Sequence, residues 1–467
     1  MAPISRLLGS RYSVLMGNVA ARVAALVCIL VATLLIARAG GPSLVGVYAL
    51  LHVLPSLVGM VVSAGLGGAV AYFVAGPSRD DRRLPLTLLA MALVSGVVGA
   101  ALWGTAAPLI GPLLFPDLPL GLVALAGLAV ATRLAVITAK SCSQGSQDLS
   151  GANRVILTEE LFFLISFGLL AGAGIGDYAA VVGGLLLSDV ATSALAWGRL
   201  VRRGFFRGAS RPSRHLARRV AAYGLRAQTG TVISQLNLRL DFIVLSVLTG
   251  PAVLGIYAIA SKFAELTKVL GMAITYVLYP QFARAGRAKA EVRARRLIPR
   301  AGLLTVGAVV PLFLAAGVVI PAFYGSEFER ASTPARIILL GLALEGVAGV
   351  ITAFLYGAGR PGLFSIAMGA GLVATVALDL LLIPRFEEVG AAAASAIAYA
   401  TSTIVLIWLF RSVNRNNATS DRQQQPGYGG STEDARSAVD GAPGRGTRRG
   451  VVAGLRFWKE GLSTGDR

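Results

Sequence analysis

Long apolar runs recur through most of this chain, and they limit what it can fold into. A helix that crosses a membrane needs about 20 apolar residues, and a backbone inside lipid must satisfy its own hydrogen bonds. The sequence holds about twelve runs of that length. Their ranges are 12–37, 45–75, 85–111, 118–140, 155–175, 178–200, 224–248, 253–281, 300–324, 335–357, 362–384 and 390–412. We therefore predict an all-α, polytopic membrane protein with about twelve transmembrane helices.

Composition and charge support this class. Hydrophobic residues make up 55% of the 467 residues and charged residues only 14%, whereas soluble domains are about a quarter charged. The net charge of +20 is concentrated in short loops between the apolar runs and in a polar tail. That distribution is typical of membrane topology and argues against nucleic acid as a partner. Isolated Cys28 and Cys142, two scattered histidines and the lack of a P-loop motif predict no metal, no cofactor and no direct use of ATP.

The loops predict the orientation. Three of them are rich in basic residues and follow the second, sixth and eighth runs. These residues are Arg79, Arg82, Arg83, Arg202, Arg203, Arg207, Arg211, Arg214, Arg218, Arg219, Arg284, Arg287, Lys289, Arg293, Arg295, Arg296 and Arg300. The intervening loops 111–118, 172–177 and 249–254 contain no lysine or arginine. By the positive-inside rule, both termini are expected in the cytoplasm and the chain in the cytoplasmic membrane.

An internal repeat predicts the organisation. The segment Gly41–Leu50 (GPSLVGVYAL) recurs as Gly250–Ile259 (GPAVLGIYAI), and a weaker echo relates Gln144–Gln147 to Tyr356–Gly359. Because both halves enter the membrane in the same direction, they are expected to be parallel repeats. The predicted units are an N-terminal six-helix lobe over 1–201, a basic linker over 202–223, a C-terminal six-helix lobe over 224–413 and a disordered tail over 414–467.

The stretch from Leu225 to Lys268 is apolar enough to span twice, yet it carries many polar side chains. They are Arg226, Gln228, Gln235, Asn237, Arg239, Asp241, Lys262, Glu265 and Lys268. Charges in lipid are costly, so such residues face a bundle interior or a wet cavity and mark a candidate site. Helical spacing places one polar arc on the run 253–281, with Lys262 at its edge. The residues of this arc are Tyr257, Ser261, Glu265, Lys268, Tyr276 and Tyr279.

Other charges lie singly within predicted spans. Arg22 and Asp189 are near the middle of the first and sixth spans, and for each one a structural ion pair remains an alternative to a functional role. Glu159, Glu160 and Asp379 are nearer the span ends, where they are expected to extend toward the interface or to pair locally. The amides of the seventh span could equally line a cavity or bond a neighbouring helix.

Several short motifs, in a fixed order, carry a family resemblance. In the second half they are Arg226–Gln228, Leu238–Asp241, Gly250–Tyr257, Tyr279–Phe282, Tyr324–Phe328, Gly357–Pro361, Leu382–Arg385 and Gly390–Ala393. Gly41–Tyr48 and Gln144–Gly145 match more loosely in the first half. With these motifs the chain resembles the polysaccharide-transporter branch, or O-antigen-type flippases, of the multidrug/oligosaccharidyl-lipid/polysaccharide exporter superfamily. The resemblance implies two helical lobes around a central cleft lined by the first, second, seventh and eighth spans.

The resemblance also implies the substrate, a polyprenyl-pyrophosphate-linked oligosaccharide moved from the inner to the outer leaflet. Polysaccharide polymerase and export machinery are the implied partners. Candidates to neutralise the pyrophosphate are the cations Arg22, Arg226, Arg239, Lys262 and Lys268. Candidates to stack on or bond the sugars are Tyr257, Tyr276 and Tyr279. Candidates to carry a coupling proton or to bind a hydrated Na⁺ are Asp241, Glu265 and Asp189.

Three alternatives belong to other functional classes. A cation-coupled multidrug exporter would share the fold, but its cleft is expected to be acidic or neutral rather than cationic. A membrane glycan polymerase or ligase usually depends on a large external loop, and the outer loops here are short. A scaffold that recruits partners through its tail would not need charges inside its spans. The chain is therefore predicted to be a transporter and not an enzyme.

Overall fold

The computed structural model describes residues 2–76 and 78–423, and every regular element among them is helical. Met1–Asn414 form one compact unit; of the second unit, Arg415–Arg467, only the end of the last helix is described. The predicted tail beyond Gln423 lies outside the described residues. The helices are α1 (Ala2–Val62), α2 (Leu66–Ala75), α3 (Leu84–Leu114), α4 (Leu120–Ala126), α5 (Leu128–Gly145), α6 (Leu149–Gly172), α7 (Asp177–Arg202), α8 (Arg214–Thr249), α9 (Pro251–Glu265), α10 (Lys268–Ala285), α11 (Arg287–Tyr324), α12 (Ser332–Gly341), α13 (Glu345–Gly357) and α14 (Pro361–Gln423).

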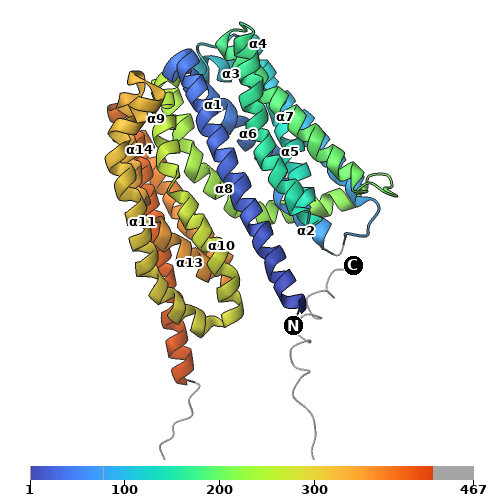
Figure 1. The fold of residues 1–467 in the computed structure, drawn as a ribbon, viewed down its shortest axis with the longest axis vertical. Helices are drawn as coiled ribbons and strands as arrows, with labels where there is room; N and C mark the ends of the chain where they lie inside the picture. The colour runs from blue at the N-terminus through green and yellow to red at the C-terminus, as the bar shows by residue number, and fades with distance from the viewer. Residues whose placement is uncertain (1, 77, 424–467) are drawn as a thin grey trace, which may run out of the picture. The chain divides into compact units, whose positions relative to one another are not determined.

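Helix α1 is two helical segments joined by a turn. Its helical geometry is broken at Gly40 and Gly41, and Gly41 has φ +62°, which glycine adopts without a steric penalty. Pro42 follows at the first position of the second segment, where its missing N–H costs nothing. Figure 1 shows the chain rising along the first segment and returning, so that α2 lies toward the end of the bundle at which α1 begins. Helix α14 is interrupted in the same way, at Glu387.

Nine helices among the described residues are long and apolar enough to cross a membrane. Their ranges are Ala20–Val62, Leu84–Leu114, Leu120–Gly145, Leu149–Gly172, Asp177–Arg202, Val232–Thr249, Arg287–Tyr324, Ser326–Gly357 and Pro361–Val413. The first and the last contain the breaks just described. The prediction of an all-helical, multi-span membrane protein is confirmed. We call the end of the bundle that carries Gly41 and Gly250 the outer end and the end with the basic loops the inner end, after the predicted orientation.

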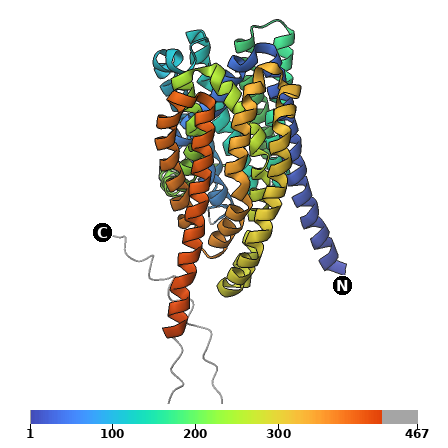
Figure 2. The same ribbon diagram turned by 90° about the vertical axis from the view of Figure 1, so that its left-hand side faces the viewer.

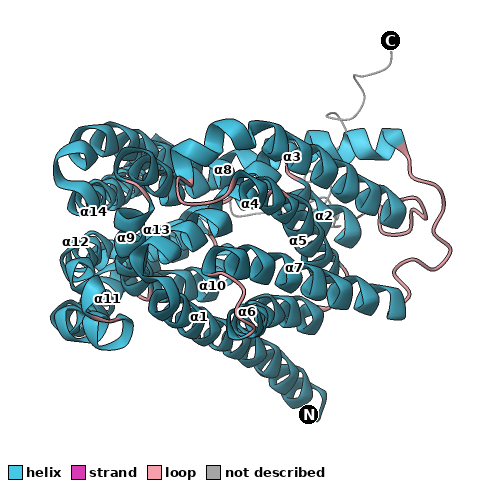
Figure 3. Ribbon diagram, turned by 90° about the horizontal axis from the view of Figure 1, so that it is seen from above, coloured by secondary structure: helices cyan, strands magenta, loops and turns pink. Residues whose placement is uncertain are grey.

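The helices gather in two groups within the compact unit. Helices α2–α7 lie on one side of α1 and α8 in Figure 1, and α9–α14 lie on the other; Figure 2 shows the α9–α14 side face-on. The strongest packing inside the groups joins α6 to α7 and α10 to α13, and α1 packs on both α6 and α9. Viewed from above, α1 and α8 run along opposite sides of the junction between the groups (Figure 3).

Two expectations need refinement. The residues 202–223, interpreted from the sequence as a linker, are only partly loop, because α8 begins at Arg214 and its Leu216 and Val220 are buried in the core formed by α2, α3 and α5. The run 253–281, interpreted as one helix, is two helices, since α9 ends at Glu265 and α10 begins at Lys268. The hydroxyl of Thr267, between them, donates to the carbonyl of Ala264.

The repeated motif supplies the contact between the groups at the outer end. A Cβ atom added to Gly46 would overlap the carbonyl oxygen of Pro251, and one added to Gly255 would overlap the carbonyl oxygen of Pro42. These two contacts are reciprocal, as expected for equivalent positions of two related copies. Each copy therefore uses its second glycine to let the backbone of the other approach closely. The sequence repeat thus marks where the two halves meet.

Candidate functional site

Three predicted site residues from different helices form one charge cluster. Arg239 of α8 and Lys268 at the start of α10 each lie 3.5 Å from the Oε1 of Glu265, the last residue of α9. Lys268 also donates to the hydroxyl of Tyr399 on α14 at 3.1 Å, with its ammonium 4.4 Å from the ring centre. The side chains are 29% (Arg239), 23% (Glu265) and 16% (Lys268) exposed, so a ligand or water can reach them.

Lys262 connects this cluster to the N-terminal group. Its ammonium lies 4.9 Å from the centre of the Tyr48 ring on α1 and interacts electrostatically with Glu160 of α6. The Lys262 ammonium also interacts electrostatically with Arg239 and Glu265. Tyr48 is fully buried and its ring stacks on Phe163 at 5.0 Å. Lys262 therefore lies where α1, α6 and α9 meet.

A second charge cluster lies inside the N-terminal group. The guanidinium of Arg133 on α5 is 3.6 Å from Asp189 of α7 and 3.9 Å from Glu159 of α6, and it is 3.2 Å from Nδ1 of His52. Thr132 donates to the Asp189 carboxylate at 3.0 Å. Arg133 and Asp189 are almost fully buried. Asp189 is thus part of a structural ion pair, the alternative to coupling that the sequence left open, and its coupling role stays a prediction.

Buried carboxylates of the C-terminal group form a third feature. Tyr257 donates from its hydroxyl to Asp241, and Ser395 donates to the same carboxylate at 3.1 Å. Close by in the sequence, Asn237 accepts from Thr375 at 2.9 Å. The expectation that Asp379 extends toward the interface is wrong, because this side chain is 0% exposed. Neither of its oxygens has a hydrogen-bond partner among the described residues, and it interacts electrostatically with Asp241.

The remaining predicted residues lie apart on the helix surfaces. Arg22 on α1 and Arg226 on α8 are exposed. On α10, Tyr276 is 69% exposed, and Tyr279 is also exposed, with its ring packed edge-on against Tyr356. The three tyrosines do not form the single polar arc that was predicted, because the helix is interrupted between α9 and α10. Tyr257, on α9, is fully buried, whereas Tyr276 and Tyr279, on α10, are exposed. The proposed substrate contacts of these residues stay predictions.

Sequence reasoning missed Tyr48, His52 and Tyr399, although one signal was available. Tyr48 and Tyr257 occupy the same position of the repeated motif, and both are buried against a charged group of the site. Neither His52 nor Tyr399 belongs to a motif, and only the packing of α1 and α14 brings them to the site.

The two charge clusters and Lys262 are balanced in charge. The cations are Arg133, Arg239, Lys262 and Lys268, and the carboxylates are Glu159, Glu160, Asp189 and Glu265. An anionic ligand must therefore compete with resident carboxylates for the cations. Among these carboxylates, Glu265 bridges the two partly exposed cations Arg239 and Lys268.

Known structures define the class of this fold. A multidrug resistance MATE family transporter of the MOP superfamily, in an inward-facing conformation, superposes with a TM-score of 0.71 at 17% identity and covers 88% of this chain and 99% of its own. The lipid II flippase MurJ, in an inward closed conformation, gives 0.64 at 15% identity, covering 86% and 87%. An outward-facing MATE structure gives 0.59 at 18% identity, covering 85% and 95%. The protein thus has the same fold as these three structures.

The sequence comparisons define the family within that class. The family model for polysaccharide biosynthesis protein matches residues 35–333, and the chain belongs to this family. A relative, the probable low-salt glycan biosynthesis flippase Agl15 of Haloferax volcanii, is 24% identical over 385 residues, covering 79% of this chain and 77% of its own. The family resemblance found in the sequence is confirmed. The chain is a multi-span membrane protein of the polysaccharide biosynthesis family.

Proposed function

We propose that this protein flips a polyprenyl-pyrophosphate-linked oligosaccharide across the cytoplasmic membrane during synthesis of a cell-surface glycan. Family membership, the likeness to Agl15 and a fold shared with the lipid II flippase support this function. The glycan and the pyrophosphate cannot cross hydrocarbon unaided, because each unsatisfied polar group costs several kcal/mol. The protein supplies a polar route for them while the polyprenyl tail stays in lipid.

The route runs between two six-helix lobes. The nine apolar helices become eleven spans when the broken helices Ala20–Val62 and Pro361–Val413 are each counted as two. The charged pair α9 and α10, counted together as one span, would be the twelfth. We expect the cleft between α1 and α8–α10, with both termini in the cytoplasm. In this proposal, the close backbone approach at Gly46 and Gly255 closes the outer end of that cleft. Rocking of the lobes about this contact alternates access, as in transporters built from parallel repeats.

The observation that carries the proposal is the cluster of Arg239, Lys262 and Lys268, in which Glu265 bridges Arg239 and Lys268 and Lys262 reaches Tyr48 of α1. The pyrophosphate takes the place of Glu265 and receives charge-assisted hydrogen bonds, which arginine donates in bidentate form. Release returns both cations to Glu265. The carboxylate thus keeps the cations paired whenever the route is empty, which limits the cost of holding them between helices.

Coupling is assigned to the buried carboxylates of the C-terminal lobe. Asp241 accepts hydrogen bonds from Tyr257 of α9 and Ser395 of α14, and Asp379, which interacts electrostatically with Asp241, has no hydrogen-bond donor among the described residues. Two neighbouring carboxylates in that setting favour a bound proton or a cation held by oxygen ligands. Loading and unloading of this site would bias the rocking of the lobes.

A cellular test separates the cation role from folding. Cells lacking the protein should accumulate the undelivered lipid-linked glycan on the inner leaflet. Arg239→Ala and Lys262→Ala should fail to restore export while reaching the membrane at normal levels. Arg293→Ala, which removes an exposed cation of α11, is the matched control and should restore it. Normal export by both site variants would refute the assignment.

A cation-coupled multidrug exporter is the second candidate, favoured by the similarity to MATE structures and by the balanced charge of the network. The two functions differ in cargo. Uptake of an organic cation by inverted vesicles, driven by an ion gradient and blocked in Asp241→Asn, would support the exporter. Export of glycan with no such uptake would support the flippase.

A further inference from the structure

A hollow of about 290 Å³ lies at the inner end of the bundle, between α6 and α7 and away from the clusters described above. Small residues create it, since Gly151, Ala194 and Gly198 form part of its lining. A Cβ atom built on Gly198 would meet nothing within 4 Å, so the space in front of that glycine is open. The hollow is too small for an oligosaccharide but large enough for a phosphate head group.

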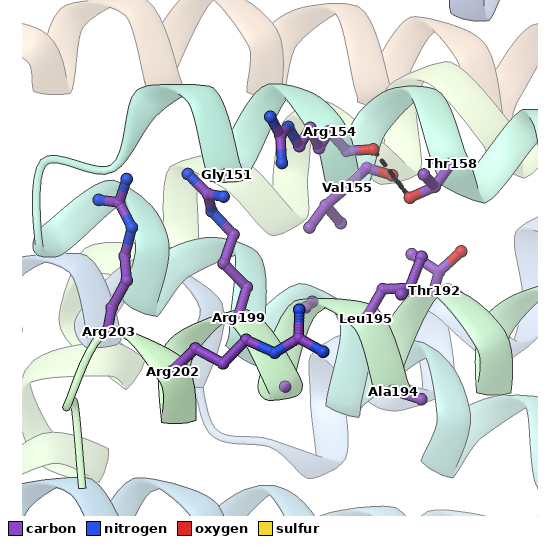
Figure 4. Close-up of a pocket in the computed structure, with 12 residues that line it drawn as sticks. Gly151, Arg154, Val155, Thr158, Thr192, Ala194, Leu195, Arg199, Arg202 and Arg203 are labelled. Atoms are coloured by element: carbon purple, nitrogen blue, oxygen red, sulfur yellow. Dashed lines mark hydrogen bonds between the residues drawn. The ribbon is translucent and has the colours of Figure 1, made fainter.

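Four arginines surround this hollow: Arg154 of α6, Arg199 and Arg202 from the last turn of α7, and Arg203 directly after it (Figure 4). Asp148 engages Arg199 through two hydrogen bonds of 2.6 and 3.0 Å and pairs with Arg203 at 3.3 Å. The hydrogen bond from Arg199 is the main cause of the lowered pKa of Asp148. Arg154 and Arg202 are exposed, and neither has an ion pair among the described residues. The lining therefore has an excess of positive charge.

A buried hydroxyl in the lining also lacks a partner. Thr192 is 0% exposed, and its Oγ1 has no hydrogen-bond partner in the described part of the chain. Thr158, the other threonine of the lining, differs, because its hydroxyl already donates to the carbonyl of Arg154 at 2.8 Å. Because that oxygen is itself buried, a ligand in the hollow does not reach it, and the phosphate contacts fall to the exposed arginines.

Exposed apolar side chains continue from the hollow toward the outer end. On α7, Leu187 and Val190 lie seven and four residues before Ala194, and these spacings place all three on one helix face. On α6, Ile165 and Leu169 lie seven and eleven residues beyond Thr158, again on its face. Each helix thus presents a polar end at the hollow and an apolar stripe above it, which matches a lipid with a charged head and acyl chains.

We propose that this hollow binds an anionic glycerophospholipid of the inner leaflet. Its phosphate takes the exposed Arg154 and Arg202, and its acyl chains lie along the stripes of α6 and α7. Basic pockets between helices at the cytoplasmic side suit anionic head groups. The occupied site would hold the cytoplasmic ends of α6 and α7 together, independently of the cargo that the protein moves.

Native mass spectrometry of the full chain in detergent, with phosphatidylglycerol and phosphatidylcholine as probes, tests this site. The double variant Arg154→Gln/Arg202→Gln keeps the Asp148 pairs and should weaken phosphatidylglycerol binding by about 30-fold. Gly198→Leu keeps every charge but fills the hollow and should weaken binding similarly. Arg218→Gln/Arg219→Gln removes the same charge from exposed positions on α8 and should change binding less than about 3-fold.

Three results would overturn the proposal. Equal losses in the site and control double variants would indicate only general attraction to basic surface. Unchanged binding in Gly198→Leu, with the variant unfolding at the wild-type temperature, would place the lipid elsewhere. Binding of glycerol 3-phosphate as tight as that of phosphatidylglycerol would show that the acyl stripes contribute nothing.

Discussion

Substituting Gly46 by alanine tests how the two halves close at the outer end. The added methyl group would overlap the carbonyl oxygen of Pro251 and lie 3.1 Å from the amide nitrogen of Gly255. Carbon and its neighbours pack comfortably at about 3.5–4 Å, so α1 and α9 must separate by more than about 1 Å. Neither neighbour is a flexible side chain that could turn away, because both are backbone atoms.

The cost of this overlap falls only on the state in which the outer end is closed. Overpacking of a tight interface costs about 1–3 kcal/mol. Since about 1.4 kcal/mol corresponds to a tenfold change, the ratio of closed to open outer ends should fall by about 5- to 150-fold. Gly255→Ala should act in the same direction, because its contact with Pro42 is reciprocal.

Distances between spin labels at Leu120 of α4 and Glu329 of the 3-10 helix Ser326–Ala331 report on this end, once Cys28 and Cys142 are replaced. Gly46→Ala should move the distribution toward longer distances. Gly307→Ala in α11, whose methyl group meets nothing within 4 Å, is the control and should leave it unchanged. A wild-type distribution in Gly46→Ala, with unchanged stability, would refute the role of this contact.

Three further substitutions have defined outcomes. Glu265→Gln frees the two cations that it bridges and should tighten binding of a polyprenyl pyrophosphate about tenfold, as measured by titration in detergent; unchanged affinity would contradict the exchange of carboxylate and pyrophosphate. Asp148→Asn should lower the stability by about 1–3 kcal/mol near neutral pH in thermal unfolding. The pKa of Asp148 is lowered in the folded state, so its contribution to stability is present above the ordinary aspartate pKa and is lost as pH falls through the lowered pKa. The Asp148→Asn variant should therefore lose little stability relative to the wild type in acid. An equal loss of stability at every pH would contradict this pairing. Asp379→Asn should leave the fold as stable as the wild type or more stable, but make flipping insensitive to an ion gradient; retained gradient dependence in vesicles would remove this residue from coupling.

The sequence predicted the all-helical membrane class, most of the spans and the repeated turns, because each depends on local patterns. Apolar length identifies a span, and the Gly41 and Gly250 motifs identify equivalent turns. The break between Glu265 and Lys268 carries no glycine or proline, so the pattern favoured one helix there, and the expected arc of tyrosines followed from that error. The separation of α9 from α10 therefore depends on tertiary packing, which the local pattern does not record.

The sequence also could not show which side chains pair between different helices. Helical spacing could group Glu265 with Lys268, but Arg239 joins them from another helix, and Tyr399 comes from more than 130 positions further along the chain. Asp379 lies near a span end, eight residues before the break of α14 at Glu387, yet its side chain is fully buried. Burial of a side chain depends on which helices pack against it, which the apolar pattern does not record.

Flipping by purified protein in proteoliposomes tests the central claim most directly. A lipid-pyrophosphate-linked oligosaccharide is placed in one leaflet, and its appearance in the other is followed with a glycan-cleaving enzyme that acts from outside only. The wild type should deliver the substrate, and Arg239→Ala and Lys262→Ala should deliver it no faster than empty liposomes. Equal delivery by all three proteins would contradict a cationic route between the two halves.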